Sequence, residues 1–365
     1  MSPPRRRRVL FLNWRDTSHP QGGGSERYVE QLARWLVESG DEVVIQCAAH
    51  SRAPACEERA GVQLRRAGNA MTVYLHGLRA VRRLRPDVVV DVLNGLPFFS
   101  PLVHRRVLLL VHHVARETWP ATYGRVIGRV GWWIESTVVR RLYRRVRFVA
   151  VSGPTRDDLV ELGVDADRVV VVHNVTDPAP VRATPAATPT LCALSRLVAH
   201  KRVEHAVEVL ARLVDEFPDI RLQVIGDGPA RGALQARAAA LGVADRVTLL
   251  GYLDETAKQT ALAGSWVLLC PSLKEGWGRV VMEAATQQVP TIAYRAAGGL
   301  RESIRDGETG LLCDDLDEMV EHARALLRDP ARRTAMGAAA RSYALSFTPE
   351  RAVTEFRRAL AASAG

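Results

Sequence analysis

The chain lacks several features that would assign it to common protein classes. Residues 1–180 contain no lysine, aromatic residues make up 6% of the 365 residues, and the five cysteines show no metal-ligand spacing. No apolar run approaches the ~18 residues that a membrane-spanning helix requires. The scarcity of aromatic residues and the absence of a nucleic-acid-binding motif argue against a nucleic-acid partner. A sparse, odd number of cysteines indicates buried thiols in a reducing compartment.

The charge of the chain is unevenly distributed. Residues 1–180 hold 27 Arg against 18 Asp and Glu, which accounts for +9 of the formal net charge of +10. Such an excess attracts an anionic substrate or an anionic membrane surface. The preference for Arg over Lys is typical of GC-rich bacterial genomes, such as those of actinobacteria.

The N-terminal sequence Met1–Arg8 passes directly into an apolar run at 9–12. This run is too short for the apolar core of a signal peptide, and no small-residue cleavage site follows it. We therefore expect a cytoplasmic protein, with a peripheral location at the inner face of the plasma membrane as the alternative.

Strand-like and helix-like segments alternate along the chain, which predicts an α/β fold with parallel sheets covered by helices. The predicted strands are 9–14, 43–47, 87–92, 107–111, 147–151, 168–172, 191–194, 221–225, 246–249, 266–270 and 291–294. A stretch rich in Pro, Ala and Thr interrupts this series and reads as a linker. We predict two doubly wound, Rossmann-like domains and a tail helix, with the boundaries 1–177, 178–189 for the linker, 190–346, and 347–365 for the tail.

Two carboxylates eight residues apart, Glu275 and Glu283, mark the most informative segment. The run 266–270 reads as a buried strand and the next helix starts near Gly278. Glu275 is therefore expected in a glycine-flanked loop at the carboxyl end of a strand, and Glu283 about a turn and a half into a helix. Ligands of doubly wound sheets bind at this edge, and a helix N-terminus suits phosphate. The segment predicts a site for a nucleotide-sugar.

This segment resembles the E-x7-E motif of the retaining glycosyltransferases of family 4, and the resemblance covers nearly the whole chain. Further motifs match in order and spacing: Gly22–Arg27, His112-His113, His173–Val175, Ser195–Leu197 with Lys201, Gly226–Pro229, Gly298-Gly299 and Asp306–Gly310. Each is weak alone, but seven in order form a specific signal. The resemblance implies the GT-B fold, in which two doubly wound domains face across a cleft and the last helix returns to the first domain.

The resemblance also implies roles for individual residues. Arg196 and Lys201 would clamp the donor diphosphate, because fixed cations stabilise the charge that grows on the leaving group. Glu275 would reach hydroxyls of the transferred sugar, and Glu283 would accept hydrogen bonds from the ribose. The alternative for each is an ordinary solvated charge. The other residues expected to bind the donor are Gly23, Gly24, Gly226, Asp227, Gly278, Arg279 and Val280.

One histidine after the strand 107–111 is implied to contact the transferred sugar, and His113 is slightly preferred over His112. The loop Gly22–Gly24 is neither a Walker motif nor G-x-G-x-x-G, so ATP and NAD are not indicated; the resemblance directs this loop to the diphosphate, and a flexible turn is the alternative. Nothing in the chain resembles the metal-binding Asp-x-Asp motif of the other large glycosyltransferase fold in its context, so we expect no metal cofactor and a GDP- or UDP-sugar as donor substrate.

A basic helix is predicted over 123–145. Its arginines at 125, 129, 140, 144 and 147 fall on one arc at helical spacing, beside Trp132-Trp133. Such a helix binds an anionic membrane surface, or it packs its apolar side on the sheet and solvates its arginines. The sequence leaves both interpretations open.

The leading hypothesis is a retaining glycosyltransferase that moves a hexose from a GDP- or UDP-sugar to an acceptor hydroxyl. The acceptor is a lipid-linked or cell-envelope glycan in one version and a soluble small molecule in another. A sugar-nucleotide epimerase or phosphorylase on the same fold, and a non-catalytic donor-binding module, are the alternatives. Motifs in both halves of the chain favour transfer.

Overall fold

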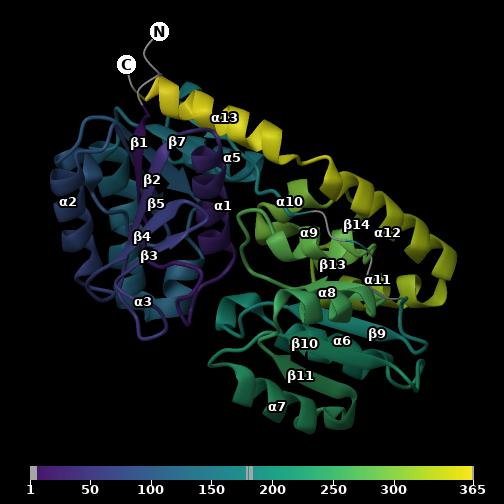
Figure 1. Ribbon diagram of the computed structural model, residues 1–365. Coiled ribbons are helices and arrows are strands. Elements are labelled where there is room, and N and C mark those ends of the chain that lie inside the picture. Colours follow the sequence, from purple (N-terminus) through teal and green to yellow (C-terminus); the bar gives the residue numbers. More distant parts are fainter. Residues whose placement is uncertain (1–5, 178–179, 181–183, 364–365) are drawn as a thin grey trace. The chain divides into compact units, whose positions relative to one another are not determined.

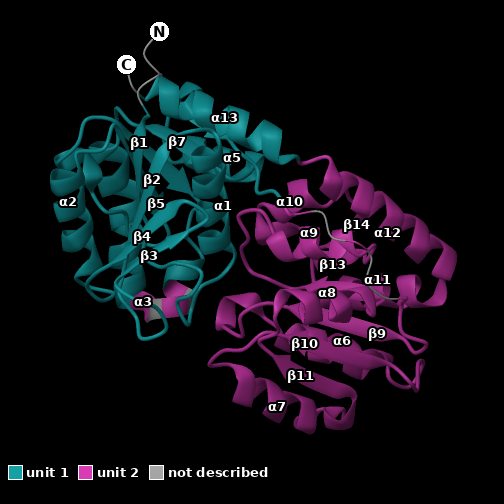
Figure 2. Cartoon of the chain, in the orientation of Figure 1, with its two compact units in different colours: residues 1–119, 126–175, 348–365 teal, residues 120–125, 176–347 magenta. Residues whose placement is uncertain are grey.

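The structure is a computed structural model that describes residues 6–177, 180 and 184–363. These residues form two compact units (Figures 1 and 2). Unit 1 comprises Met1–Trp119, Val126–Val175 and Thr348–Gly365, and unit 2 comprises Pro120–Arg125 and Thr176–Phe347. Five residues of the predicted linker, 178–179 and 181–183, lie outside the described residues.

Unit 1 is built on one sheet, with helices on both faces. Its strands are β1 Arg8–Leu12, β2 Glu42–Cys47, β3 Cys56–Arg59, β4 Val62–Arg66, β5 Val88–Leu93, β6 Val107–Val111, β7 Arg147–Ala150 and β8 Val169–Val171. They lie in the order β3-β4-β2-β1-β5-β6-β7-β8. All neighbours are parallel except β3 and β4, which form an antiparallel hairpin at the edge.

The alternation of side chains along β1 explains why both faces of this sheet are covered. Leu10 and Leu12 belong to a buried cluster with Val81 of helix α2 (Val73–Leu84). Phe11 points to the other face and stacks on Phe356 of α13 (Pro349–Ala362), with 6.1 Å between ring centroids. The tail helix therefore packs on the first unit, together with α1 (Gly24–Glu38), as the fold class predicted.

The prediction of one continuous helix over 123–145 is wrong. The segment divides into α3 (Thr118–Trp133), which is interrupted at Gly124 with φ 77°, a π-helical turn over Ile134–Val139, and a short α4 (Arg140–Leu142). A π turn adds a residue to the repeat, so the arginines on either side of it do not share one arc. The remaining helix of this unit is α5 (Gly153–Glu161).

Unit 2 is a second parallel sheet between helices. Its strands are β9 Thr190–Leu194, β10 Arg221–Ile225, β11 Val247–Gly251, β12 Val267–Cys270, β13 Thr291–Tyr294 and β14 Gly310–Cys313. Its helices are α6 Glu204–Leu213, α7 Arg231–Ala240, α8 Glu255–Ala263, α9 Arg279–Thr286, α10 Leu300–Ser303, α11 Leu316–Arg328 and α12 Pro330–Leu345. On β9, Leu191 and Ala193 face the core with α6 and α11, whereas Cys192 faces α8 and α9.

The strand order of unit 2, β11-β10-β9-β12-β13-β14, places a topological switch point between β9 and β12. The chain runs outward from β9 in one direction, and then returns to β12 on its other side. Loops that leave neighbouring strands in opposite directions open a crevice at their carboxyl ends, and ligands of such sheets bind there. The segments that follow β9 and β12 contain Lys201 and Glu275.

The predicted buried thiols are confirmed for Cys47, Cys192 and Cys270, which are free and buried in the structure. Burial raises the pKa of Cys192 to about 12, and burial with a contribution from Glu275 does the same for Cys270. In the part of the chain that the structure describes, no helix is long and apolar enough to cross a membrane.

Candidate functional site

An ion pair occupies the switch point of unit 2. The Nζ of Lys201 donates a hydrogen bond to Oε1 of Glu275 at 2.5 Å, and Oγ of Ser272 donates to the same oxygen at 2.7 Å. The side chains of Lys201 and Glu275 are 16% and 15% exposed. Two residues 74 positions apart thus meet because β9 and β12 are adjacent in the sheet.

The loop that carries Glu275 is fixed by its backbone. The N–H of Glu275 donates to the carbonyl of Ala297 at 2.8 Å, and the N–H of Gly299 donates to the carbonyl of Glu275 at 2.9 Å. A Cβ at Gly299 would lie 2.0 Å from the carbonyl oxygen of Gly276, so only glycine fits there. The motif Gly298-Gly299 therefore has a steric role in holding the carboxylate.

The loops after β9 and β10 interlock beside this ion pair. The N–H of Leu197 donates to the carbonyl of Asp227 at 2.9 Å. Gly226 adopts φ 125°, and a Cβ there would lie 1.9 Å from the carbonyl oxygen of Ser195. The structure thus brings Gly226 and Asp227 against the segment of Arg196, whose side chain is exposed at this edge.

The predicted phosphate-binding turn is the N-terminus of α9. Gly278 precedes the helix with φ 84° and ψ 56°, and a Cβ there would lie 2.3 Å from Cδ2 of Leu300. The first N–H groups of a helix have no partner within the helix and favour an anion. Arg279 and Val280 occupy these positions, whereas the N–H of Val281 donates back to the carbonyl of Gly278 at 2.9 Å.

Glu283, the second carboxylate of the segment, is buried in an ion pair that sequence reasoning missed. The Nζ of Lys258 donates to Oε2 of Glu283 at 2.9 Å, and also to Oε2 of Glu255 at 3.0 Å. Lysine is so rare in this chain that each lysine could have been taken as a signal: there are three, and two of them pair with Glu275 and Glu283.

His200 is a second residue that the sequence did not single out. Its carbonyl accepts a hydrogen bond from the N–H of Leu273 at 2.8 Å, which joins the two loops of the site. Burial, together with the charges of Lys201 and Arg196 and against the opposing effect of Glu275, lowers the pKa of His200 to about 4. The imidazole is therefore neutral near pH 7 and adds a hydrogen-bonding group without charge.

In unit 1, the glycine loop rests on a buried carboxylate. Glu26 is fully buried, and its Oε2 accepts a hydrogen bond from the N–H of Gly23 at 2.7 Å, while Oε1 accepts from Nε of Arg15 and from Nδ2 of Asn94, each at 3.2 Å. Burial alone would raise the pKa of Glu26, but the charge of Arg15 and the Gly23 N–H outweigh it, so the pKa is lowered. α1 begins at Gly24, directly above this anchor. The approach of Gly23 and Gly24 to a donor stays a prediction.

The two histidines after β6 differ in their surroundings. His112 is buried, and its ring packs edge-on against Tyr28 of α1 at 5.9 Å between centroids. His113 is half-buried at the carboxyl end of the strand. This difference is consistent with the preference for His113 as the ligand-binding histidine, a role that stays a prediction.

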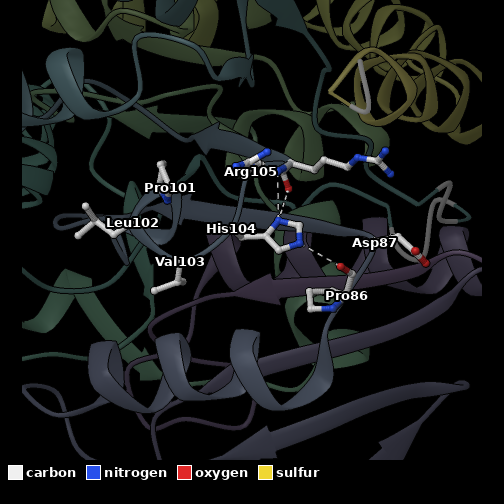
Figure 3. A pocket seen from close by; sticks show the side chains of 8 residues that line it. Pro86, Asp87, Pro101, Leu102, Val103, His104 and Arg105 are labelled. Carbon is white, nitrogen blue, oxygen red and sulfur yellow. Dashed lines mark hydrogen bonds between the residues drawn. The ribbon is translucent and has the colours of Figure 1, made fainter.

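A hollow in unit 1 lies away from the edge at which the reaction is expected. An open hollow of about 640 Å³ lies at the amino ends of β5 and β6, where His104 bridges to the carbonyl of Pro86 at 3.0 Å (Figure 3). Parallel sheets bind their ligands at the opposite, carboxyl edge. Among the described residues, no group of three or more His, Cys, Asp or Glu side chains is arranged to hold a metal ion.

Comparisons with known proteins agree with this geometry. Residues 180–343 match the family model "Glycosyl transferases group 1", and residues 22–179 match "Glycosyltransferase Family 4". Sucrose-phosphate synthase from Thermosynechococcus elongatus superposes with a TM-score of 0.82 at 19% identity, covering 97% of this chain and 98% of that one. The Anabaena protein HepE in complex with UDP and glucose gives 0.76 at 17% identity, covering 98% and 100%. Two Rossmann-like parallel-sheet domains with these neighbours define the GT-B fold.

Two curated relatives share part of the sequence of this chain. The GDP-mannose-dependent alpha-(1-6)-phosphatidylinositol monomannoside mannosyltransferase of Mycolicibacterium smegmatis is 31% identical over 253 residues, which are 63% of this chain and 66% of the relative. The N-acetyl-alpha-D-glucosaminyl L-malate synthase of Bacillus anthracis is 36% identical over 159 residues, 43% and 41% of the two chains. The matches thus span under two thirds of each relative. The two family models, which together cover residues 22–343, support a glycosyltransferase of the family-4 type.

Proposed function

We propose that the protein is a retaining glycosyltransferase that moves a hexose from a GDP- or UDP-sugar to an acceptor hydroxyl. The observation that supports this most strongly is the ion pair of Lys201 and Glu275 at the switch point of unit 2, next to Arg196 and the N-terminus of α9. Cations for a diphosphate and a carboxylate for sugar hydroxyls lie at one edge of one sheet. Unit 2 is accordingly proposed as the donor-binding domain, and unit 1 as the acceptor side.

The proposed reaction assigns these groups to separate tasks. The acceptor oxygen forms a bond to the anomeric carbon, the bond from that carbon to the diphosphate breaks, and the acceptor proton passes to the departing phosphate. Arg196, Lys201 and the first N–H groups of α9 stabilise the charge that develops on the diphosphate. Glu275 accepts hydrogen bonds from the transferred sugar, and Glu283 from the ribose.

The donor is tested by ligand-induced stabilisation. We expect a GDP- or a UDP-sugar to raise the melting temperature, because a ligand at ~100 times its Kd stabilises the folded state by about 2.7 kcal/mol. ADP-glucose and NAD serve as controls and are expected to give smaller shifts. A panel in which neither guanosine nor uridine diphosphate sugars shift the melting temperature would contradict the donor assignment.

A product assay separates transfer from the alternative functions on this fold. An epimerase converts the nucleotide-sugar without an acceptor, and a phosphorylase requires inorganic phosphate as a substrate. A non-catalytic module binds the donor without turnover. Acceptor-dependent release of a nucleoside diphosphate is the outcome expected here.

The acceptor side of the proposal rests on an exposed apolar strip of α3. Val126, Ile127, Val130 and Trp133 are 77%, 60%, 55% and 56% exposed, and Arg129 is exposed between them. Apolar side chains with Trp next to arginines suit the surface of an anionic membrane. The charge excess of residues 1–180 has the matching sign. We propose that the protein associates peripherally with such a surface and receives a lipid-linked acceptor there.

Vesicle binding tests this association. We expect the wild type to bind anionic vesicles at low salt and to lose binding as salt rises, because exposed charges are screened within ~8 Å at physiological ionic strength. Replacing Val130 and Trp133 by Ser, or Arg125 and Arg129 by Glu, is expected to weaken binding about tenfold or more, because all four side chains are exposed on α3 and each basic residue near the surface contributes ~1 kcal/mol.

The matched control is Arg332→Glu, which changes an exposed arginine of α12 in the other unit. It is expected to leave vesicle binding nearly unchanged. A wild type that ignores anionic vesicles at low salt would refute the membrane proposal. A soluble small-molecule acceptor would then be favoured, and the donor site in unit 2 would be unaffected.

A further inference from the structure

Lys258 lies outside every motif of the chain, yet its ammonium group is enclosed in the proposed donor domain. It belongs to the second turn of α8, and its side chain is 8% exposed. Its Nζ donates to Oε2 of Glu283 at 2.9 Å and to Oε2 of Glu255 at 3.0 Å. The side chain of Glu283 is 9% exposed, so the pair with Lys258 is almost fully removed from water.

The residue type at this position is informative because the chain uses arginine almost everywhere else. Three of its 50 basic residues are lysines. Lys201 pairs with the first glutamate of the E-x7-E segment and Lys258 with the second. An ammonium is a compact point charge with three donors, whereas a guanidinium is a wide planar fork. Both glutamates are thus held by the rarer and smaller cation.

A row of hydrogen-bonded side chains beside the Lys258–Glu283 pair holds the pair in place from the side of α8. Oε1 of Glu255 accepts from Nε2 of Gln259 at 2.9 Å, and Oε1 of Gln259 accepts from Nε2 of Gln287 at 2.7 Å. Gln287 directly follows α9, so this row of hydrogen bonds joins the two helices that carry Lys258 and Glu283. Buried polar networks whose members are satisfied hold a functional side chain in one orientation.

We propose that Lys258 is a positioning residue for donor binding, which acts by orienting Glu283 toward the ribose. It occupies Oε2 of the carboxylate and leaves Oε1 to accept from the ribose hydroxyls. This inference rests on the proposed function, because it needs a nucleotide in the site of unit 2. Lys258 does not touch the reacting atoms in this proposal.

A variant that lacks Lys258 is expected to bind the donor more weakly and to transfer the sugar at nearly the same rate once the donor is bound. A buried carboxylate that loses its cation is unfavourable and reorients or takes up water. The contact of Glu283 with the ribose is equally present in the bound donor and in the transition state. Its loss therefore raises KM and leaves kcat nearly unchanged.

The experiment measures the affinity for nucleoside diphosphates with and without ribose hydroxyls. The probes are UDP and GDP and their 2′,3′-dideoxy analogues, titrated into the wild type, Lys258→Met and Lys258→Gln. We expect the wild type to prefer the ribonucleotide. Both variants are expected to bind it about tenfold or more weakly, as for the loss of a charged hydrogen-bonding group, and to bind the dideoxy analogue as the wild type does.

Two further variants bracket this result. Lys258→Arg keeps the charge and is expected to retain part of the preference for ribose. Glu255→Gln removes the negative charge of the other partner of Lys258 and is expected to weaken binding of the ribonucleotide less than Lys258→Met and Lys258→Gln do. Lys258→Gln is also neutral, and its side-chain amide can still donate a hydrogen bond inside the protein. It replaces Lys258→Met in the experiment if that variant does not fold.

Two outcomes would overturn the inference. An unchanged preference for ribose in the neutral variants would show that Lys258 does not act through Glu283. An equal loss of affinity for the ribonucleotide and its dideoxy analogue would show a general structural role. A wild type that binds neither UDP nor GDP would instead refute the proposed function, which distinguishes the two failures.

Discussion

Glu275→Ala is expected to abolish glycosyl transfer and to leave the protein folded. Glu275 lies at the carboxyl end of β12 in a loop whose backbone bonds to Ala297 and Gly299 do not involve its side chain. The change removes a carboxylate that the proposal assigns to the transferred sugar, together with the partner of Lys201. Product formation by the purified variant and its melting temperature measure both parts of the expectation.

Binding of the nucleoside diphosphate distinguishes a role of Glu275 toward the transferred sugar from a role in holding the nucleotide. Because UDP and GDP carry no sugar, we expect Glu275→Ala to bind them within a few-fold of the wild type while transfer is lost. Glu321→Ala is a matched control, since that side chain is 67% exposed on α11 of the same unit. Near-native turnover by Glu275→Ala would remove Glu275 from the catalytic groups.

Both sheets could be predicted from the sequence, because buried parallel strands appear in it as nearly continuous apolar segments. It missed the edge hairpin of β3 and β4, whose residues are mostly polar, such as Glu57 and Arg65. The residues of β3 alternate between exposed and half-buried positions, and those of β4 between buried and half-buried ones. It also missed the short strand β14, where Gly310 to Cys313 follow a turn directly. Short or half-polar strands depend on their neighbours for pairing and carry little signal of their own.

The helix over 123–145 was predicted wrongly for a tertiary reason. Glu135 in the π turn is buried and accepts hydrogen bonds from the N–H of Ala115 at 2.8 Å and from Nε1 of Trp119 at 2.7 Å. Burial raises the pKa of Glu135 to about 7. Helical periodicity contains no information about such a partner, so the interruption could not be read from local spacing.

The candidate site was predictable only where it follows from strand ends. Lys201 and Glu275 were both placed after strands, and the adjacency of β9 and β12 brings them within hydrogen-bonding distance. The partner of Glu283 depends on how α8 docks on α9, which the sequence does not specify. Lys258 therefore escaped notice, although its residue type is rare in the chain.

Lys201→Ala and Arg196→Ala are each expected to lower turnover by roughly 10²–10³, the usual cost of removing one preorganised group that stabilises developing charge. Lys201 is largely buried in its ion pair, whereas Arg196 is exposed at the edge of the sheet. The effect should fall on kcat, because the negative charge of the diphosphate is greatest as the glycosidic bond breaks. Steady-state kinetics with saturating donor measures it.

Arg212→Ala is the matched control, since Arg212 is an exposed cation on α6 whose partner Asp317 is also exposed. It is expected to turn over normally. If Lys201→Ala and Arg196→Ala do so as well, the diphosphate binds elsewhere. A double variant of Lys201 and Glu275 gives a sharper test, because residues in direct contact are not additive. If the two side chains act on one donor, the double variant should lose little more than the worse single variant, whereas independent surface charges would give losses that multiply.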